Sequence, residues 1–267
     1  MVIQDIFYHI QHGNIVKVRD IIYTDYDIHT VNEYSRTPLL QACRFGHRDI
    51  ALLLLHHGAN INDVDERGCT ALMYAIWSGK IRLVRSLIYY GVDYNMCSQL
   101  KVSPLMCACM ADDVIMIREM LLYNNVNQRD SNGKTALHYA VQTGDELMLD
   151  TLIQAGGDVM ARTNIGDTIL DHAVMFENVE LMHKLIGLSV PLSEHTKPQG
   201  QCKNILTEAL WYIDKNNINH DKFIHHNFLY HSSIGNIKWV RDYVEKMKKH
   251  HKSSWYRKNH LHASTNT

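Results

Sequence analysis

Apolar side chains recur along this chain with the spacing of short amphipathic helices, which come in pairs. Segments such as IALLLLHHGANIN and IRLVRSLIYYGVDYN carry apolar residues at intervals of three and four, so one face of each predicted helix is suited to burial. A shorter apolar segment that opens on threonine or serine precedes each of them, with a turn between the two. The pattern predicts an all-α chain of helix–turn–helix units.

These units recur at a nearly fixed interval. Their opening residues lie 33, 33, 32 and 33 residues apart, at Thr37, Thr70, Ser103, Thr135 and Thr168. The turn follows nine residues later, at Gly46, Gly79, Asp112, Gly144 and Glu177. A unit of this size cannot bury its apolar face alone, so the period predicts a solenoid in which neighbouring units stack.

Residues with strong local preferences fit this prediction. Each opening hydroxyl is expected to cap a helix, and Pro38 and Pro104 stand in the first turn, where no N–H donor is needed. We expect left-handed glycines to end the second helices, with Asn124, which tolerates the same conformation, replacing them in the short unit. The glycines are Gly58, Gly91 and Gly156. Small residues that allow the first helices to pack closely are Ala42, Ala75, Ala108, Ala140 and Ala173.

Residues 33 to 190 resemble the ankyrin repeat. The letters TPL at 37–39, GH at 46–47 and GANIN at 58–62 reproduce much of that family's signature. The resemblance implies an all-α ankyrin-repeat solenoid with β-turn fingers between its units. It also implies a non-catalytic protein that binds a protein partner on its concave surface, as an adaptor or scaffold.

We expect four segments along the chain. Residues 1–30 are a divergent N-terminal capping repeat, 31–190 five ankyrin repeats, 191–245 divergent C-terminal helical repeats, and 246–267 a basic, flexible tail. The capping assignment rests on Gly13, which lies 33 residues before Gly46. Terminal repeats depart from the pattern because one of their faces meets water.

His138, in the stretch LHYA, raises the question of chemistry, because a histidine side chain titrates near neutral pH. The sequence places no nucleophile or carboxylate beside it, and the resemblance implies that it braces neighbouring loops. We align Leu40, Met73, Met106 and Leu170 with it, so no array of bases repeats. We therefore expect no enzyme activity, no cofactor and no small-molecule substrate.

Two groups of side chains are of types that bind metals. Cys107 and Cys109 lie two residues apart, so they point to different sides of a helix. The other group is a histidine-rich stretch with a cysteine upstream, and its spacing does not fit a zinc site. It comprises Cys202, His220, His225, His226 and His231. We predict no metal site at either place.

The composition of the chain limits its possible partners and compartment. Hydrophobic residues make up 46% of the chain, enough for a sizeable core, and 27 basic against 28 acidic residues give no global attraction to nucleic acid or membrane. No apolar run reaches the roughly 18 to 20 residues that span a bilayer, and no secretion signal opens the chain. Six scattered cysteines fit a reducing compartment. We expect a soluble monomer in the cytoplasm, with the nucleus as the alternative.

The resemblance places partner contacts at the finger tips and at the ends of the first helices. We expect Phe45, Trp77, Met110 and Leu100 to form an apolar stripe flanked by arginines, as binding surfaces often do. Alternatively, Trp77 and Phe45 simply cover crevices between repeats. The predicted contact residues are Tyr34, Arg36, Arg44, Phe45, Arg67, Trp77, Leu100, Met110, Gln142, Met175 and Phe176.

The sequence indicates two further sites. In LIYYGVDYN, the residues Leu87, Asp93 and Asn95 match what an asparaginyl hydroxylase favours in ankyrin repeats, so the resemblance implies that Asn95 is a substrate. The C-terminal basic cluster would contact nucleic acid or an anionic membrane, although a solvated helix end is the interpretation that we favour. It comprises Lys246, Lys248, Lys249, Lys252, Arg257 and Lys258. An alternative overall function is a regulatory or substrate-recognition subunit that links its partner to an enzyme or a transcription complex.

Overall fold

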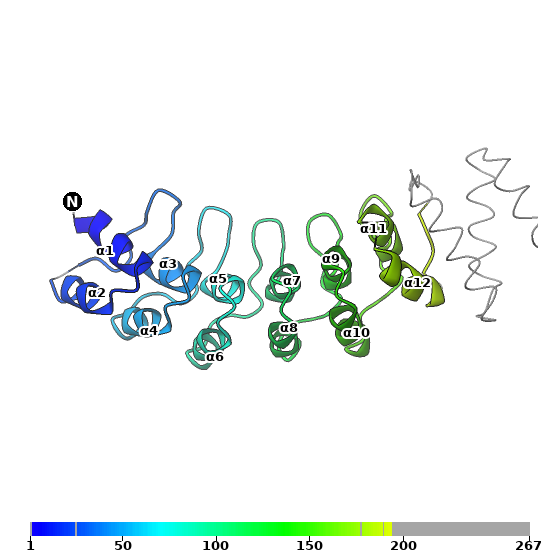
Figure 1. The fold of residues 1–267 in the computed structure, drawn as a ribbon. Helices are drawn as coiled ribbons and strands as arrows, with labels where there is room; N and C mark the ends of the chain where they lie inside the picture. Colours follow the sequence, from blue (N-terminus) through cyan, green and yellow to red (C-terminus); the bar gives the residue numbers. More distant parts are fainter. Residues whose placement is uncertain (1, 25, 177, 189, 194–267) are drawn as a thin grey trace, which may run out of the picture.

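The computed structural model describes residues 2–24, 26–176, 178–188 and 190–193, which form helices stacked side by side (Figure 1). The first helices of successive repeats form one row and the second helices another. The pairs are α1 (Val2–Gln11) with α2 (Ile15–Ile22), α3 (Pro38–Arg44) with α4 (Arg48–His56), α5 (Ala71–Trp77) with α6 (Ile81–Tyr89), α7 (Pro104–Met110) with α8 (Val114–Met120), α9 (Ala136–Thr143) with α10 (Glu146–Gln154), and α11 (Ile169–Met175) with α12 (Val179–Gly187). Within these ranges the predicted all-α solenoid is confirmed.

One apolar core runs along the whole stack. Each first helix contacts the next first helix, from α1 through to α11. The five alanines predicted at close approaches have no exposed surface, and neither do Leu54, Leu87 and Leu152 of the second helices. Burying one such leucine contributes about 2 kcal/mol. Because these contacts join neighbouring repeats, each repeat depends on the next one for its stability.

The opening threonines and serine cap their helices as predicted. The hydroxyls of Thr37, Thr70, Ser103 and Thr168 each accept a hydrogen bond from the backbone N–H three residues later. At Thr135, the hydroxyl and the backbone N–H both bond to Nδ1 of His138, at 3.0 and 3.1 Å. His138 therefore closes the first turn of its own helix.

The alignment of Leu170 with His138 is wrong. The residue three positions after Thr168 is Asp171, whose Oδ2 accepts the Thr168 backbone N–H at 2.6 Å. The spacing from the opening residue decides the geometry, so Asp171 performs the same capping role as His138. Leu170 lies one position earlier and is buried in the core.

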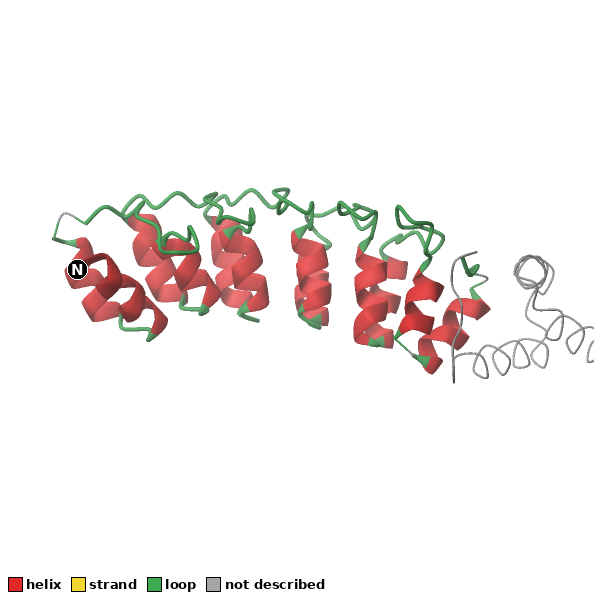
Figure 2. Cartoon of the chain, turned by 90° about the horizontal axis from the view of Figure 1, so that it is seen from above, coloured by secondary structure: helices red, strands yellow, loops and turns green. Residues whose placement is uncertain are grey.

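A short polar side chain closes each finger, five residues before the opening threonine or serine. Asp65 shows the arrangement, because its Oδ1 accepts the N–H groups of Arg67 at 2.9 Å and Cys69 at 2.8 Å. The equivalent residues are Asn32, Ser98, Asp130 and Thr163. The fingers all lie at one end of the helices (Figure 2).

Backbone hydrogen bonds join the second to the fifth finger into a continuous edge. The N–H of Gln99 donates to the carbonyl of Arg67 at 2.9 Å. The same bond recurs from Ser131 to Leu100 and from Asn164 to Asn132, both at 2.8 Å. This edge fixes the spacing of the finger tips.

The ends of the second helices follow the prediction except in the short unit. Gly58, Gly91 and Gly156 have positive φ angles, of 93°, 84° and 88°. The expectation for Asn124 is wrong, since the described non-glycine residues with positive φ are Ser35, Lys101 and Asp112. Because α8 ends early, at Met120, Asn124 stands beyond the helix, where its Nδ2 donates to the carbonyl of Tyr94 at 2.7 Å.

The last described residues return to the fifth repeat. The Thr168 hydroxyl donates to the carbonyl of Pro191 at 2.7 Å, and the Ser193 N–H donates to the Asp171 carboxylate at 2.9 Å. No helix among residues 2–193 as described is both long and apolar enough to cross a membrane. The rest of the predicted C-terminal repeats, the histidine-rich stretch and the basic cluster lie outside the described residues.

Candidate protein-interaction surface

The predicted partner-binding residues fall into two rows. The finger row contains Tyr34, Arg36, Arg67 and Leu100, and the helix row, at the ends of the first helices, contains Arg44, Phe45, Trp77, Met110, Gln142, Met175 and Phe176. Helix α5 has 7 residues and is therefore about 10 Å long. The finger row therefore precedes the N-terminal ends of the first helices, and the helix row lies at their C-terminal ends.

The predicted apolar stripe is divided between these rows. Trp77 and Met110 end α5 and α7 in adjacent repeats, and each is 41% exposed. Leu100 is more exposed, but it stands in a finger. Phe45 is half-buried, and the Arg44 guanidinium lies 5.5 Å from its ring centre. The structure thus places Phe45, Trp77 and Met110 in one row and Leu100 in the other.

The other predicted residues differ in how much of their side chains is exposed to a partner. Arg67, Met175 and Phe176 are exposed. Gln142 is half-buried, and its Nε2 lies 3.5 Å from Nδ1 of His172 in the next repeat. The exposed residues are free to meet a ligand, whereas Gln142 already contacts a neighbouring repeat.

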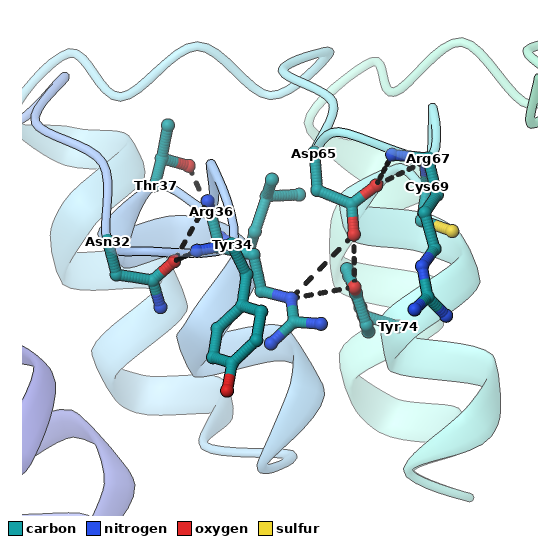
Figure 3. Close-up of polar contacts among 9 residues, drawn as sticks. Asn32, Tyr34, Arg36, Thr37, Asp65, Arg67, Cys69 and Tyr74 are labelled. Atoms are coloured by element: carbon teal, nitrogen blue, oxygen red, sulfur yellow. Dashed lines mark hydrogen bonds and ion pairs between the residues drawn. The ribbon is translucent and has the colours of Figure 1, made fainter.

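The two rows come together in what we call the finger–helix patch, which comprises Tyr34, Arg36, Tyr74 and Trp77. Figure 3 shows the first three of these residues. The Arg36 guanidinium lies 4.7 Å from the ring centre of Tyr34 and 5.3 Å from that of Tyr74. Tyr74 in turn meets Trp77 edge to face, with ring centres 5.6 Å apart. The patch presents two half-exposed aromatic rings, Tyr34 at 45% and Trp77 at 41%, on a buried support.

A charged network holds this support in place. Nε of Arg36 donates to the Tyr74 hydroxyl at 2.8 Å, and that hydroxyl donates to Oδ2 of Asp65 at 2.5 Å. Arg36 comes from the first finger, whereas Asp65 and Tyr74 belong to the second repeat, so the network spans a repeat boundary. It fixes the aromatic rings before any partner arrives, which reduces the entropy lost on binding.

The electrostatics of the network follow from burial and hydrogen bonding. Burial alone would raise the pKa of Asp65, but hydrogen bonds from Tyr74, Cys69 and Arg67, together with the charge of Arg36, bring it below its usual value. Burial and the bond to Asp65 raise the pKa of Tyr74 to about 12. Asp65 is therefore ionised and Tyr74 neutral at pH 7. Both side chains stabilise the fold.

Tyr74 is not among the contact residues predicted from the sequence, although the sequence carries a signal for it. Asp65 and Tyr74 lie nine residues apart, and the same pair recurs in the fourth repeat, where the Tyr139 hydroxyl donates to Oδ2 of Asp130 at 2.7 Å. In these two repeats, the carboxylate that closes the finger is hydrogen-bonded to a tyrosine nine residues later, on the helix that follows.

His138 has the surroundings of a structural residue. It is fully buried, and burial, with the nearby His172, lowers its pKa to about 4. The two imidazole rings meet edge to face, with centres 5.2 Å apart. At pH 7 His138 is neutral, and its Nδ1 is occupied by the helix cap.

The two cysteines considered as metal ligands are both buried in α7. Burial raises the pKa of Cys107 well above its usual value and that of Cys109 to about 12, so both are protonated thiols at neutral pH. Among the described residues, no three His, Cys, Asp or Glu side chains gather in a way that could hold a metal ion.

Asn95 is exposed in the loop after α6, and its N–H donates to Oδ1 of Asp93 at 2.9 Å. Leu87, the apolar residue of the predicted hydroxylase motif, is fully buried in α6. The two elements of that motif are therefore not accessible together in the folded repeat.

The repeats of this chain are similar to those of known proteins. The family profile described as ankyrin repeats, three copies, matches residues 6–98 and 82–163. A viral protein named "Putative ankyrin repeat protein L271", from Acanthamoeba polyphaga mimivirus, is 34% identical over 97 residues. That alignment covers 36% of this chain and 12% of the viral protein.

Proposed function

This chain belongs to the ankyrin-repeat family, whose repeats generally mediate protein–protein interaction, and from this premise we propose that it is a non-catalytic adaptor or scaffold. Its partner is a protein that docks on the surface formed by the fingers and the first helices. The finger–helix patch is the proposed centre of this contact. We propose the cytoplasm as the working compartment, with the nucleus as the alternative.

One observation carries this proposal. Tyr34 and Trp77 are large aromatic side chains that remain nearly half exposed although they lie on the buried Arg36–Tyr74 support. Tyrosine, tryptophan and arginine dominate the energetic centres of protein interfaces. Rigid aromatic rings also lose little conformational freedom when a partner binds.

Two observations favour binding over catalysis. His138, the residue most suggestive of chemistry, has its Nδ1 occupied by a helix cap. The hydroxyl of Tyr74, the buried tyrosine of the finger–helix patch, donates to a buried carboxylate and accepts from Arg36. Neither group is available as a base or a nucleophile in the folded repeat.

The test is affinity capture from cell lysate with matched variants. The wild-type chain should retain a protein that the double variant Tyr34→Ala/Trp77→Ala loses. The control is Tyr23→Ala, because Tyr23 is an exposed aromatic at the end of α2, away from the patch. Equal retention by the wild type and the double variant would contradict the proposal.

A second candidate function involves the C-terminal third of the chain. We propose, as a second candidate, that residues 191–245 link the bound partner to an enzyme or a transcription complex, which makes the chain a regulatory or substrate-recognition subunit. The concentrated charge of residues 246–258 favours an additional contact with nucleic acid or an anionic membrane. Truncation after residue 245 should abolish such binding, and the binding should weaken steeply with salt if phosphates are the ligand.

A further inference from the structure

A second surface lies on the other row of helices. We infer that the hollow between α4 and α6, which we call the outer groove, binds an acidic segment of a protein partner. It is a shallow hollow of about 560 Å³, and its lining combines arginines and tyrosines with one leucine and one serine. The lining residues are Arg48, Leu52, Arg82, Arg85, Ser86, Tyr89 and Tyr90.

Two of the arginines are held in fixed positions. Nε of Arg48 donates to Oγ of Ser86 at 2.8 Å, and Ser86 is buried and bonded to the carbonyl of Arg82. Nε and Nη2 of Arg85 donate to Oε2 of Glu119 in the next repeat, at 3.0 and 2.7 Å. These bonds use part of each guanidinium and leave other N–H donors for a ligand.

Arg82 provides the charge that the neighbours do not balance. Arg85 is compensated by Glu119, and Arg48 has Asp49 at 3.5 Å. Arg82 is exposed, and within the described ranges its guanidinium forms no ion pair. The outer groove thus combines one uncompensated positive charge with two oriented guanidiniums, and guanidinium groups match the geometry of carboxylates.

The other end of the outer groove is aromatic. The Tyr90 hydroxyl is hydrogen-bonded to Nε2 of His56 at 2.9 Å, and Tyr89 meets Tyr90 edge to face. Tyr89 is 85% exposed, unusually high for an aromatic side chain on a folded surface. Together with Leu52, these rings offer an apolar contact in the same hollow as the arginines. A peptide that alternates carboxylates with apolar side chains fits both halves.

The next junction along the stack lacks the arginines of the outer groove. At the junction of α6 and α8, the residues equivalent to Arg48 and Arg82 are Ile81 and Ile115, and Glu119 stands in the place of Ser86. The concentration of arginine therefore does not follow from the repeat pattern. It distinguishes α4 and α6 from the helices of the next repeat.

The experiment measures binding of a labelled synthetic peptide of alternating glutamate and leucine by fluorescence anisotropy. The wild-type chain should bind it, and Arg82→Glu and Tyr89→Ala should each weaken binding by about tenfold or more, as expected when a charge-assisted or aromatic contact is lost. The control is Arg118→Glu, which changes the net charge equally at an exposed arginine of α8 outside the groove. Both Arg82 and Tyr89 are exposed, so the variants should fold with an unchanged urea midpoint.

Three results with the peptide and its competitors would overturn the inference. They are no binding of the acidic peptide, equal weakening by Arg118→Glu, and equally tight binding of a single-stranded RNA or of phosphatidylserine vesicles. The variant Trp77→Ala separates this surface from the finger–helix patch. The peptide affinity should be unchanged in Trp77→Ala, and a matching loss there would also contradict a separate outer site.

Discussion

Nε of Arg36 lies 3.7 Å from Oδ2 of Asp65, across the boundary between the first two fingers. The Asp65 side chain is completely buried, and that of Arg36 is nearly so. The ion pair joins neighbouring repeats. It also holds the aromatic rings of the finger–helix patch in position. Arg36, predicted from the sequence as a contact for a partner, is also part of the scaffold beneath that contact.

The substitution Arg36→Ala should destabilise the repeats. It leaves the buried Asp65 carboxylate without its cationic neighbour and removes a donor from Tyr74, which should cost about 1–3 kcal/mol. Urea unfolding followed by circular dichroism measures this loss. Arg67→Ala is the matched control, since its exposed side chain should contribute no more than about 0.5 kcal/mol. Equal losses in the two variants would refute a scaffolding role for Arg36.

Acid should destabilise the fourth and fifth repeats through His138. Its folded pKa of about 4 lies below the unfolded value of 6.5, so the unfolded chain binds the proton more tightly. The stability contributed by the neutral imidazole is complete above pH 6.5 and falls as the pH decreases toward 4, by about 2 kcal/mol at pH 5.

The measurement is the free energy of unfolding between pH 7.5 and pH 5, for the wild type and for His138→Gln, whose amide does not titrate. The variant should lose less stability over this range than the wild type. Identical pH slopes would show that His138 does not bind its proton more tightly in the unfolded chain. His172, whose pKa is also lowered by burial, should add to the slope in both proteins.

The fingers should tolerate an added side chain unequally. A Cβ at Gly68 would lie 2.8 Å from the backbone nitrogen of Gln99, which donates the bond between adjacent fingers. Gly166 holds the same place in the fifth finger, with a similar positive φ and open space around it. Gly68→Ala should therefore cost about 1–3 kcal/mol more than Gly166→Ala. Thermal unfolding of the two variants measures this difference. Equal losses of stability would show that the contact between fingers does not contribute.

Hydroxylation of Asn95 should depend on opening of the repeat. The loop is exposed, but Leu87 is buried, so an enzyme that recognises both residues requires α6 to unfold locally. Mass spectrometry of the Asn95 peptide, after coexpression with an asparaginyl hydroxylase, should show added oxygen, and more of it in a destabilised variant such as Gly68→Ala. A peptide without added oxygen in both proteins would remove this site.

The sequence predicts the fold well because each repeat is specified locally. The threonines that cap helices, the turn glycines and the apolar spacing act within a few residues of one another, so Thr37, Gly46 and Gly58 can be assigned without a structure. Asn124 was misassigned because its role depends on where α8 ends, which the packing of the short repeat decides.

The candidate surface is less predictable, because it depends on contacts between repeats. Arg36 and Tyr74 are 38 residues apart, and their hydrogen bond is formed by stacking. The same holds for Arg48 and Ser86, also 38 residues apart, which orient the outer groove. Each separation exceeds one repeat, so these contacts depend on how neighbouring repeats stack and not on local preferences.

The most direct test of the central claim compares binding with stability in one pair of proteins. For a partner obtained by affinity capture, calorimetry should give an affinity for Tyr34→Ala/Trp77→Ala that is weaker by at least about 2 kcal/mol, the scale of an interface hot spot. Both rings are nearly half exposed, so the free energy of unfolding should change by less than that amount. An unchanged affinity accompanied by a large loss of stability would show that Tyr34 and Trp77 cover the boundaries between repeats and do not bind a partner.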